Sequence, residues 1–170
     1  MGVRRVVTGQ DKAGKAIVVS DEEIEHDRTA VMDFASLWGA DEAPHFPQDG
    51  RMPEKSAVMF PGPGGYRFFT WTLAPNSVSA PTPEEMAALP PDIRRHMEAD
   101  APGMHTSDTV DLEIVLAGEA SLEFDNGAIV HLKAGDYLVQ NGTRHRWFNR
   151  GDVPTTVAGV IIGGHARAGH

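Results

Sequence analysis

The chain has 170 residues, of which 41% are apolar, and carries a formal net charge of −9. This length supports one compact domain with its own core, and the negative charge disfavours nucleic acid and anionic membranes as partners. The absence of cysteine excludes disulfides, thiolate metal ligands and cysteine nucleophiles. Because no apolar run has the length of a signal peptide or a membrane span, we expect a cytoplasmic protein.

The first part of the chain predicts a β-hairpin followed by a strand and irregular segments. Residues 4–7 and 16–20 are short β-branched runs on either side of a turn. Residues 21–30 are acidic and polar, which predicts a loop. Residues 32–38 predict another strand, and the prolines, acids and amides of residues 41–56 predict irregular structure.

The segment Tyr66–Leu73 reads YRFFTWTL and predicts a strand dense in aromatic side chains. Successive side chains of a strand point to opposite faces. Phe69, Trp71 and Leu73 therefore share one face, and Phe68 lies on the other.

The segment 82–100 interrupts the β pattern. Thr82 is a good N-cap and Pro83 suits the first helical position, which predicts a helix. A double proline at 90–91 ends this helix, and residues 92–98 predict a second one. The insertion is either a lid over a barrel mouth or a surface excursion without a role.

From Thr109 onward the chain becomes regularly β. Short apolar runs alternate with turns rich in glycine, asparagine and aspartate, and this spacing is typical of an antiparallel sandwich or barrel. The predicted strands are residues 110–116, 121–124, 128–132, 137–140, 146–149 and 155–162.

Two segments in this region resemble the paired sequence motifs of the cupin superfamily. The first reads GMHTSDTVDLEIVLAGE and contains His105; the second reads GDYLVQNGTRHRWFN and contains Gly135, His145 and Asn149. The resemblance covers residues 66–162. It implies an all-β fold, a cupin-type double-stranded β-helix (jelly-roll barrel) with an N-terminal β-hairpin and a short helical insertion.

The first motif also carries a narrower resemblance. Its His-x-x-Asp-Thr-x-Asp run is similar to that of a subgroup of small single-domain cupins from bacteria and fungi. Some similar proteins accompany aromatic-compound or polyketide metabolism, which implies a small organic substrate. The chain departs from the subgroup at Leu112, where a tyrosine often follows the aspartate.

The resemblance also implies a set of metal ligands. The metal-binding cupin pattern places ligands at three positions of the first motif and at the histidine of the second; here these are His105, Ser107, Asp111 and His145, so a serine replaces one histidine. The remaining two histidines and one carboxylate suit a non-haem Fe(II) centre and also accept Zn²⁺, Mn²⁺ or Ni²⁺. Glu113 follows one alternation later and is a candidate fourth ligand or general base.

Three functions are compatible with these residues. The favoured one is a metal-dependent enzyme of the oxygenase, isomerase or lyase class, with His105, Asp111, Glu113 and His145 as its catalytic residues. The second is a metal-free enzyme that isomerises, cyclises or dehydrates its substrate, with the two histidines as the titrating pair. The third is a cupin that binds a small molecule without catalysis, in which an inward histidine and aspartate pair only by hydrogen bonding.

A wider group of residues is expected to line the substrate pocket, with core packing as the alternative for its aromatic members. These residues are Ser107, Thr109, Tyr137, Trp147 and Trp71.

The domain organisation follows from the same elements. We expect residues 1–65 to form the hairpin and an irregular extension packed on the barrel, residues 66–163 to form the barrel with its insertion, and residues 164–170 to form a flexible tail. The resemblance implies a homodimer, and we expect the hairpin or the strand Tyr66–Leu73 to contribute to its interface.

Overall fold

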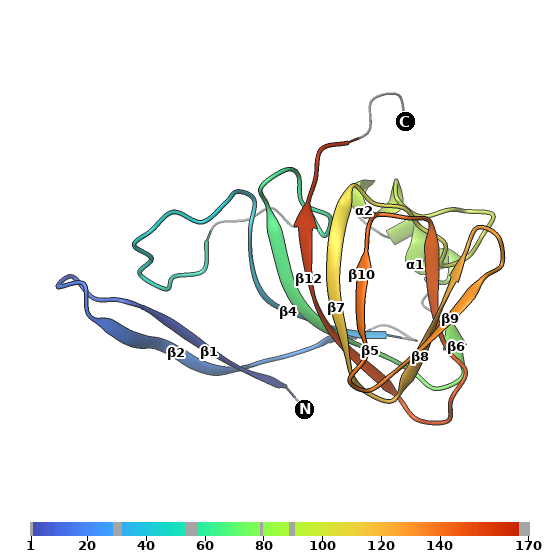
Figure 1. Ribbon diagram of the computed structural model, residues 1–170, viewed down its shortest axis with the longest axis horizontal. Coiled ribbons are helices and arrows are strands. Elements are labelled where there is room, and N and C mark those ends of the chain that lie inside the picture. The colour runs from blue at the N-terminus through green and yellow to red at the C-terminus, as the bar shows by residue number, and fades with distance from the viewer. Residues whose placement is uncertain (1, 29–31, 54–57, 79, 89–90, 167–170) are drawn as a thin grey trace.

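The computed structural model describes residues 2–28, 32–53, 58–78, 80–88 and 91–166, and most of its elements are strands (Figure 1). The strands are β1 (Val3–Gln10), β2 (Ala16–Ile24), β3 (Asp27–Arg28), β4 (Met32–Ala40), β5 (Tyr66–Leu73), β6 (Ser77–Val78), β7 (Thr109–Ala117), β8 (Glu119–Phe124), β9 (Ile129–Lys133), β10 (Tyr137–Gln140), β11 (His145–Asn149) and β12 (Thr155–Gly163). The helices are α1 (Pro83–Ala88) and α2 (Pro91–Arg94). Within the described ranges, no helix is both long enough and apolar enough to cross a membrane.

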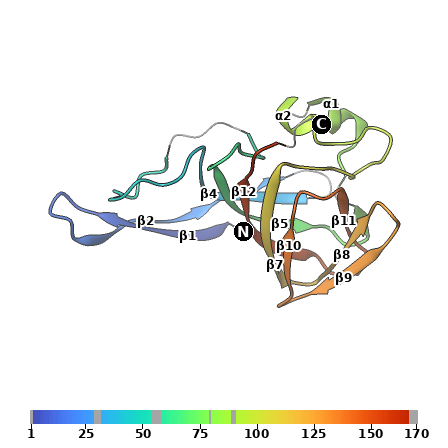
Figure 2. The same cartoon turned by 45° about the horizontal axis from the view of Figure 1, so that its top comes forward.

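Two antiparallel sheets face each other and form the barrel. One has six strands in the order β10-β7-β12-β5-β4-β3, and the other has four in the order β6-β11-β8-β9 (Figures 1 and 2). Between them Trp71 of β5 meets Trp147 of β11 edge to face, with 5.1 Å between the ring centroids. Leu73, Leu122 and Val157 are completely buried around this pair. The apolar core therefore fills the space between the two sheets.

β7 carries polar side chains into this interior. Its burial alternates along the strand, so that Thr109, Asp111, Glu113 and Val115 are buried. The polar residues Thr109, Asp111 and Glu113 lie along this inward face before Val115. A strand in the middle of the larger sheet thus places two carboxyl groups inside the barrel.

The hairpin formed by β1 and β2 is a separate two-stranded sheet that projects from the side of the barrel (Figures 1 and 2). Near its base, the Arg5 guanidinium donates a hydrogen bond to the carbonyl oxygen of Leu37 at 2.9 Å and lies over the Trp38 ring. The base of the hairpin thus contacts strand β4 of the barrel. Beyond its base the hairpin contacts the 48–50 segment, where the Gln10 backbone N–H donates a hydrogen bond to the Gln48 carbonyl oxygen at 3.0 Å.

The loop predicted at residues 21–30 is wrong for most of its described part. β2 continues to Ile24, and the Arg4 guanidinium of β1 donates two hydrogen bonds of 2.8 Å to the Asp21 carboxylate. Cross-strand pairing of opposite charges makes acidic side chains acceptable in a strand. A further short strand occupies Asp27–Arg28, and the last two residues of the segment lie outside the described ranges.

The helical insertion begins as the sequence predicts. Thr82 Oγ1 accepts a hydrogen bond from the Glu85 amide at 3.2 Å, and Glu85 Oε2 accepts one from the Thr82 amide at 2.8 Å. This reciprocal pair is a capping box. The second helix, Pro91–Arg94, is shorter than predicted, and residues 89–90 lie outside the described ranges.

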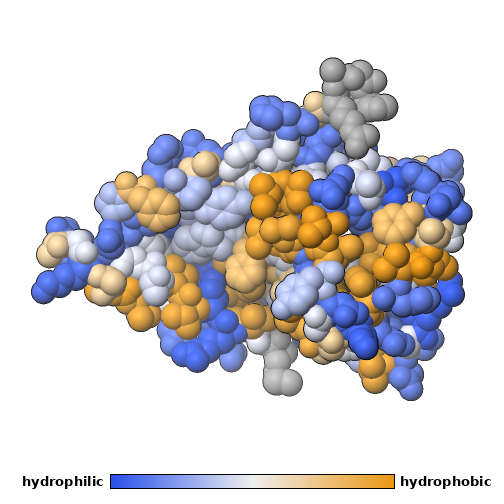
Figure 3. Space-filling model, viewed as in Figure 1, coloured by the Kyte–Doolittle hydropathy of each residue, from blue (hydrophilic) through white to orange (hydrophobic). Residues whose placement is uncertain are grey.

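The outer face of the six-stranded sheet carries an apolar row. The strand registers place Val139 beside Leu112, Leu112 beside Val160, Val160 beside Phe68, and Phe68 beside Trp38. Val139 is 59% exposed, Leu112 44% and Phe68 40%. Apolar surface gathers over the middle of this face in Figure 3. Apolar patches of this kind mark docking surfaces.

Candidate functional site

The two motif histidines lie side by side at one end of the barrel. His105 and His145 form an isolated antiparallel bridge, in which each backbone N–H donates to the other's carbonyl oxygen, at 3.0 and 3.1 Å. The centroids of the two imidazole rings are 4.2 Å apart. His145 begins β11, whereas His105 precedes β7 and belongs to no regular strand. The backbone bridge therefore fixes the spacing of the two rings.

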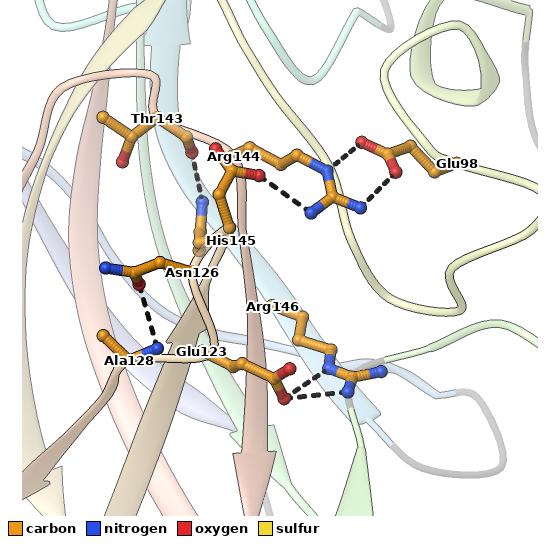
Figure 4. Close-up of polar contacts among 9 residues, drawn as sticks. Glu98, Glu123, Asn126, Ala128, Thr143, Arg144, His145 and Arg146 are labelled. Carbon is orange, nitrogen blue, oxygen red and sulfur yellow. Dashed lines mark hydrogen bonds and ion pairs between the residues drawn. The ribbon is translucent and has the colours of Figure 1, made fainter.

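Both imidazole rings are oriented by backbone carbonyl groups. His105 Nδ1 lies 3.0 Å from the carbonyl oxygen of Gly103, and His145 Nδ1 lies 2.8 Å from that of Thr143 (Figure 4). A carbonyl oxygen can only accept a hydrogen bond, so each neutral ring carries its proton on Nδ1. The lone pair of each neutral imidazole is then on Nε2, which is available to a ligand.

Burial keeps both histidines neutral. Desolvation lowers the pKa of His105, and it lowers that of His145 to about 4, with the neighbouring His105 as a further cause. A charged imidazolium is disfavoured in this surrounding because it loses its hydration. At neutral pH the pair therefore accepts hydrogen bonds or protons rather than supplying positive charge.

A chain of hydroxyl groups leads along the inward face of β7 to Asp111. Thr109 Oγ1 donates to Asp111 Oδ1 at 2.7 Å and lies 2.8 Å from Ser107 Oγ. Because the Thr109 hydroxyl proton is directed at the carboxylate, Ser107 donates to Thr109. All three residues are buried.

The two carboxyl groups of β7 have raised pKa values. Burial raises the pKa of Asp111 to about 6, against the lowering effect of the Thr109 hydrogen bond. The pKa of Glu113 is raised to about 8. Burial is the main cause, the charge of Asp111 is the second, and a hydrogen bond with Trp71 acts in the opposite direction. The two groups thus titrate on either side of neutral pH.

The helical insertion lies over the histidine end of the barrel. The Phe60 ring packs between His96 of the insertion and His105, with centroid distances of 4.7 and 6.3 Å. Arg144, beside His145, binds both carboxylate oxygens of Glu98 at 2.6 Å (Figure 4). A hollow of about 150 Å³ opens at this end, and Phe60, Arg95, His96, Asp108 and Thr109 are among the residues that line it. The insertion is therefore anchored beside the site.

The pocket residues expected from sequence separate into three groups. Ser107 and Thr109 join the polar chain of β7, whereas Trp71 and Trp147 pack against each other in the core. Tyr137 is 77% exposed, so its assignment to the pocket is wrong. On β10 the burial pattern places Leu138 and Gln140 inward and turns Tyr137 and Val139 outward.

Sequence reasoning missed Gln140, Phe60 and His96. Gln140 is 2% exposed and is the register partner of Asp111. The alternation along β10 could have identified it once Val139 was assigned to the outer face. Phe60 and His96 come from segments without a motif, so only the packing of Phe60 against His96 and His105 reveals them.

Comparisons with known proteins identify the fold. The chain is similar to the cupin domain of Cnp3 from Schizosaccharomyces pombe, with a TM-score of 0.53 and 10% identity over 96% of this chain and 89% of that one. It is also similar to an uncharacterised conserved protein with a double-stranded β-helix domain from Klebsiella pneumoniae, with a TM-score of 0.50 and 17% identity over 85% and 87% of the two chains. The chain has the cupin fold. The predicted all-β cupin-type barrel is confirmed.

Sequence relatives of the chain match only a short segment, and no family model matches it. Phomopsin biosynthesis cluster protein C′ of Diaporthe leptostromiformis is 47% identical over 47 residues, which are 28% of this chain and 25% of that protein. Oryzines biosynthesis cluster protein J of Aspergillus oryzae is 44% identical over 48 residues, 28% of this chain and 27% of that protein. The match thus spans about a quarter of the length of these curated relatives.

The cupin resemblance implies a metal at the histidine pair, and the side chains allow its fit to be tested. The two Nε2 lone pairs are suitable donors, but Asp111 accepts a hydrogen bond from Thr109. Among the residues that the structure describes, no group of three or more histidine, cysteine, aspartate or glutamate side chains lies close enough to hold a metal ion. His105, Asp111 and His145 therefore do not fit a three-ligand centre in this arrangement.

Proposed function

We propose that this cupin is an enzyme that moves protons on a small organic substrate bound at the histidine end of the barrel. The observation that carries the proposal is the pair of buried carboxyl groups on β7, with a pKa of about 6 for Asp111 and about 8 for Glu113. Adjacent acids whose pKa values lie on either side of the working pH are suited to opposite roles.

The roles follow from the protonation states at neutral pH. Asp111 is mostly ionised and takes a proton from a substrate carbon, and Glu113 is mostly protonated and gives one to a substrate oxygen. The electron pair of the broken C–H bond then either forms an enol, which is an isomerisation, or expels the protonated oxygen as water, which is a dehydration. The neutral Nε2 atoms of His105 and His145 accept hydrogen bonds from substrate hydroxyl groups and orient them.

The sequence relatives support a small-molecule substrate. By name, the two matching fungal proteins belong to clusters for the biosynthesis of phomopsin and of oryzines. We infer a role of the same general kind for this chain, in the conversion of a small metabolite. The aromatic side chains near the histidines, Phe60 above all, suit a substrate with an apolar or aromatic body.

Deuterium exchange tests the proposal without knowledge of the natural substrate. Chelator-treated protein is incubated in D₂O with a panel of small ketones, beginning with acetophenone, and NMR follows the loss of the protons next to the carbonyl group. We expect catalysed exchange with at least one ketone, and Asp111→Asn should slow it by about 10²–10⁴-fold. The exposed loop variant Asp152→Asn should leave the rate unchanged.

Two results would contradict the acid–base proposal. One is exchange at the same rate in the Asp111→Asn variant. The other is tight binding of a ketone without exchange of any panel member, which would favour a binding module.

A second candidate is the metal-dependent enzyme that the sequence predicts. One observation favours it: both histidines present Nε2 while Nδ1 is held by a backbone carbonyl, which is the usual orientation of metal-ligating histidines. His105 and His145 would be the ligands, and the Asp111 carboxylate, whose Oδ1 accepts from Thr109, would have to move toward them to become the third. Metal content of protein purified without chelator tests this candidate.

A further inference from the structure

Gln140 holds a buried hydrogen-bond donor that has no partner among the residues the structure describes. The side chain is 2% exposed, and its Nε2 atom is enclosed without an acceptor in reach. An unpaired buried donor destabilises the fold, so an atom of this kind indicates a missing partner. An amide donor can be paired with an acceptor oxygen of a bound molecule.

The orientation of the Gln140 amide is fixed by its neighbour. Gln140 Oε1 accepts a hydrogen bond from the backbone N–H of Thr143 at 3.3 Å and another from the Thr143 hydroxyl. A backbone N–H can only donate, so the atom facing it must be the amide oxygen. The NH₂ group is therefore the part of the side chain left without a partner.

The same neighbour connects Gln140 to the histidine pair. The Thr143 carbonyl oxygen accepts the hydrogen bond from His145 Nδ1, so one residue orients both side chains. Across the sheet, Gln140 is paired in register with Asp111. The unpaired Gln140 donor thus lies in the strand region between Asp111, the proposed base, and His145.

Thr109 links the hollow at the barrel mouth to Asp111. Thr109 borders the hollow, and its hydroxyl donates to Asp111. A molecule in the hollow therefore contacts the residue that hydrogen-bonds to Asp111, the register partner of Gln140.

We propose that the Gln140 Nε2 group donates a hydrogen bond to a carbonyl or carboxylate oxygen of the bound substrate. This inference rests on the proposed function and names its substrate class: a compound with a carbonyl or carboxylate group next to the carbon that loses its proton. In the proton transfer, negative charge develops on that oxygen, and a preorganised donor there stabilises it. Gln140 is then a catalytic residue that contacts the substrate oxygen.

The side-chain NH₂ resonances of Gln140 report this contact directly. They are assigned by triple-resonance NMR in uniformly ¹⁵N,¹³C-labelled protein and observed during titration with acetophenone, with benzoate and with α-methylstyrene. The last probe has the shape of acetophenone but a CH₂ group in place of the oxygen. We expect a downfield shift of a Gln140 amide proton with acetophenone or benzoate and none with α-methylstyrene.

Asn149 is the matched internal control. It is 1% exposed, and its Nδ2 group already donates to the carbonyl oxygens of Leu73 and Val153, at 3.4 and 2.8 Å. Its NH₂ resonances should stay in place with all three probes. The inference is overturned if neither oxygen-bearing probe moves the Gln140 resonances, or if a nuclear Overhauser effect from a bound water to Gln140 persists at saturation.

A substitution separates ligand contact from a purely structural role. Gln140→Met should weaken acetophenone binding by about tenfold, the effect of one lost buried hydrogen bond, and leave α-methylstyrene binding unchanged. Equal weakening of both probes would mean that Gln140 only shapes the barrel. These measurements follow binding, whereas deuterium exchange follows catalysis. Either one can fail while the other succeeds, so the Gln140 contact and the acid–base function are tested separately.

Discussion

Gly159 on β12 is the register partner of Glu113 on β7, and the missing side chain at Gly159 makes room for the glutamate. A β-carbon at Gly159 would lie 2.8 Å from Cγ of Glu113 and 3.0 Å from a ring carbon of Phe69. Both neighbours are buried, so an added β-carbon would displace at least one of them. The glycine therefore determines where the carboxyl group of Glu113 lies.

Gly159→Ala is predicted to displace Glu113. Overpacking of this kind costs about 1–3 kcal/mol of unfolding free energy, and the proton transfer should slow because the acid is moved. Urea unfolding and the deuterium-exchange rate measure the two effects. In the double variant with Glu113→Ala most of the lost stability should return, since the obstructing atoms are gone. Additive destabilisation in the double variant would contradict this account.

The stability of the metal-free protein should fall as pH rises from about 5 to about 8. The pKa of Glu113 is raised to about 8, so the folded state keeps its proton where the unfolded state loses it. The favourable difference is complete below the ordinary glutamate pKa and is lost on passing through pH 8, with about 1.4 kcal/mol for each unit of pKa difference as an upper limit. Asp111 acts in the same direction.

Urea unfolding at pH 5, 7 and 9 measures this dependence. Glu113→Gln should reduce the slope and should be more stable than the unsubstituted protein at pH 9, because the buried amide carries no charge. An unchanged slope in that variant would show that Glu113 is not the group responsible.

Chelation is predicted to leave the deuterium-exchange activity intact. The proposed acid and base are protein carboxyl groups, and the described side chains assemble no three-ligand centre. Exchange rates before and after chelator treatment, together with elemental analysis, provide the measurement. A loss of more than about tenfold that one equivalent of Fe²⁺, Zn²⁺, Mn²⁺ or Ni²⁺ restores would favour the metal-dependent candidate instead.

The ion pair between Glu98 and Arg144 is predicted to hold the helical insertion at the barrel mouth. It has two hydrogen bonds of 2.6 Å, and Arg144 holds the pKa of Glu98 below its usual range. A double-mutant cycle with Glu98→Gln and Arg144→Met should give a coupling of about 1 kcal/mol. Amide hydrogen exchange in residues 91–98 should accelerate in either variant.

The neighbouring ion pair of Glu123 with Arg146 joins two strands of the barrel and is the control for this experiment (Figure 4). It is removed by Glu123→Gln, because Arg146 also donates a hydrogen bond to the Pro102 carbonyl oxygen beside the insertion. Its removal should not accelerate exchange in the insertion. If removal of either ion pair accelerated amide exchange in the insertion equally, the cause would be general loosening of this end of the barrel.

We predict a homodimer formed through the apolar row on the outer face of the six-stranded sheet. Phe68 of the row lies on the strand Tyr66–Leu73, and the projecting hairpin adds exposed valines, with Val6 at 50% and Val18 at 63%. Light scattering should give the mass of two chains, and Leu112→Lys should give one. Val153→Lys, at a loop residue that is 51% exposed, should leave the dimer intact. A monomeric unsubstituted protein would refute the prediction.

The amino-acid pattern alone was sufficient for much of the fold. The strands Tyr66–Leu73 and Tyr137–Gln140 have the predicted bounds, and Phe69, Trp71 and Leu73 are buried on one face as alternation requires. Turn residues and side-chain alternation are local properties, so they can be read without knowing which strands are neighbours. The helix start at Thr82 and the shared inward face of Asp111 and Glu113 also follow from neighbouring residues alone.

Only the tertiary structure decided how the site is composed. Tyr137 and Gln140 lie on one short strand, yet the first faces solvent and the second faces Asp111, because the register with β7 selects the inward side. Burial raises the pKa values of Asp111 and Glu113, and that of Glu113 is also lowered by a hydrogen bond with Trp71, which is remote in sequence. The sequence by itself determined a cupin-type barrel with two histidines and two acids. The folded chain decided the spacing of the two imidazole rings and the raised pKa values of the acids, because long-range pairing and burial are set by the whole barrel.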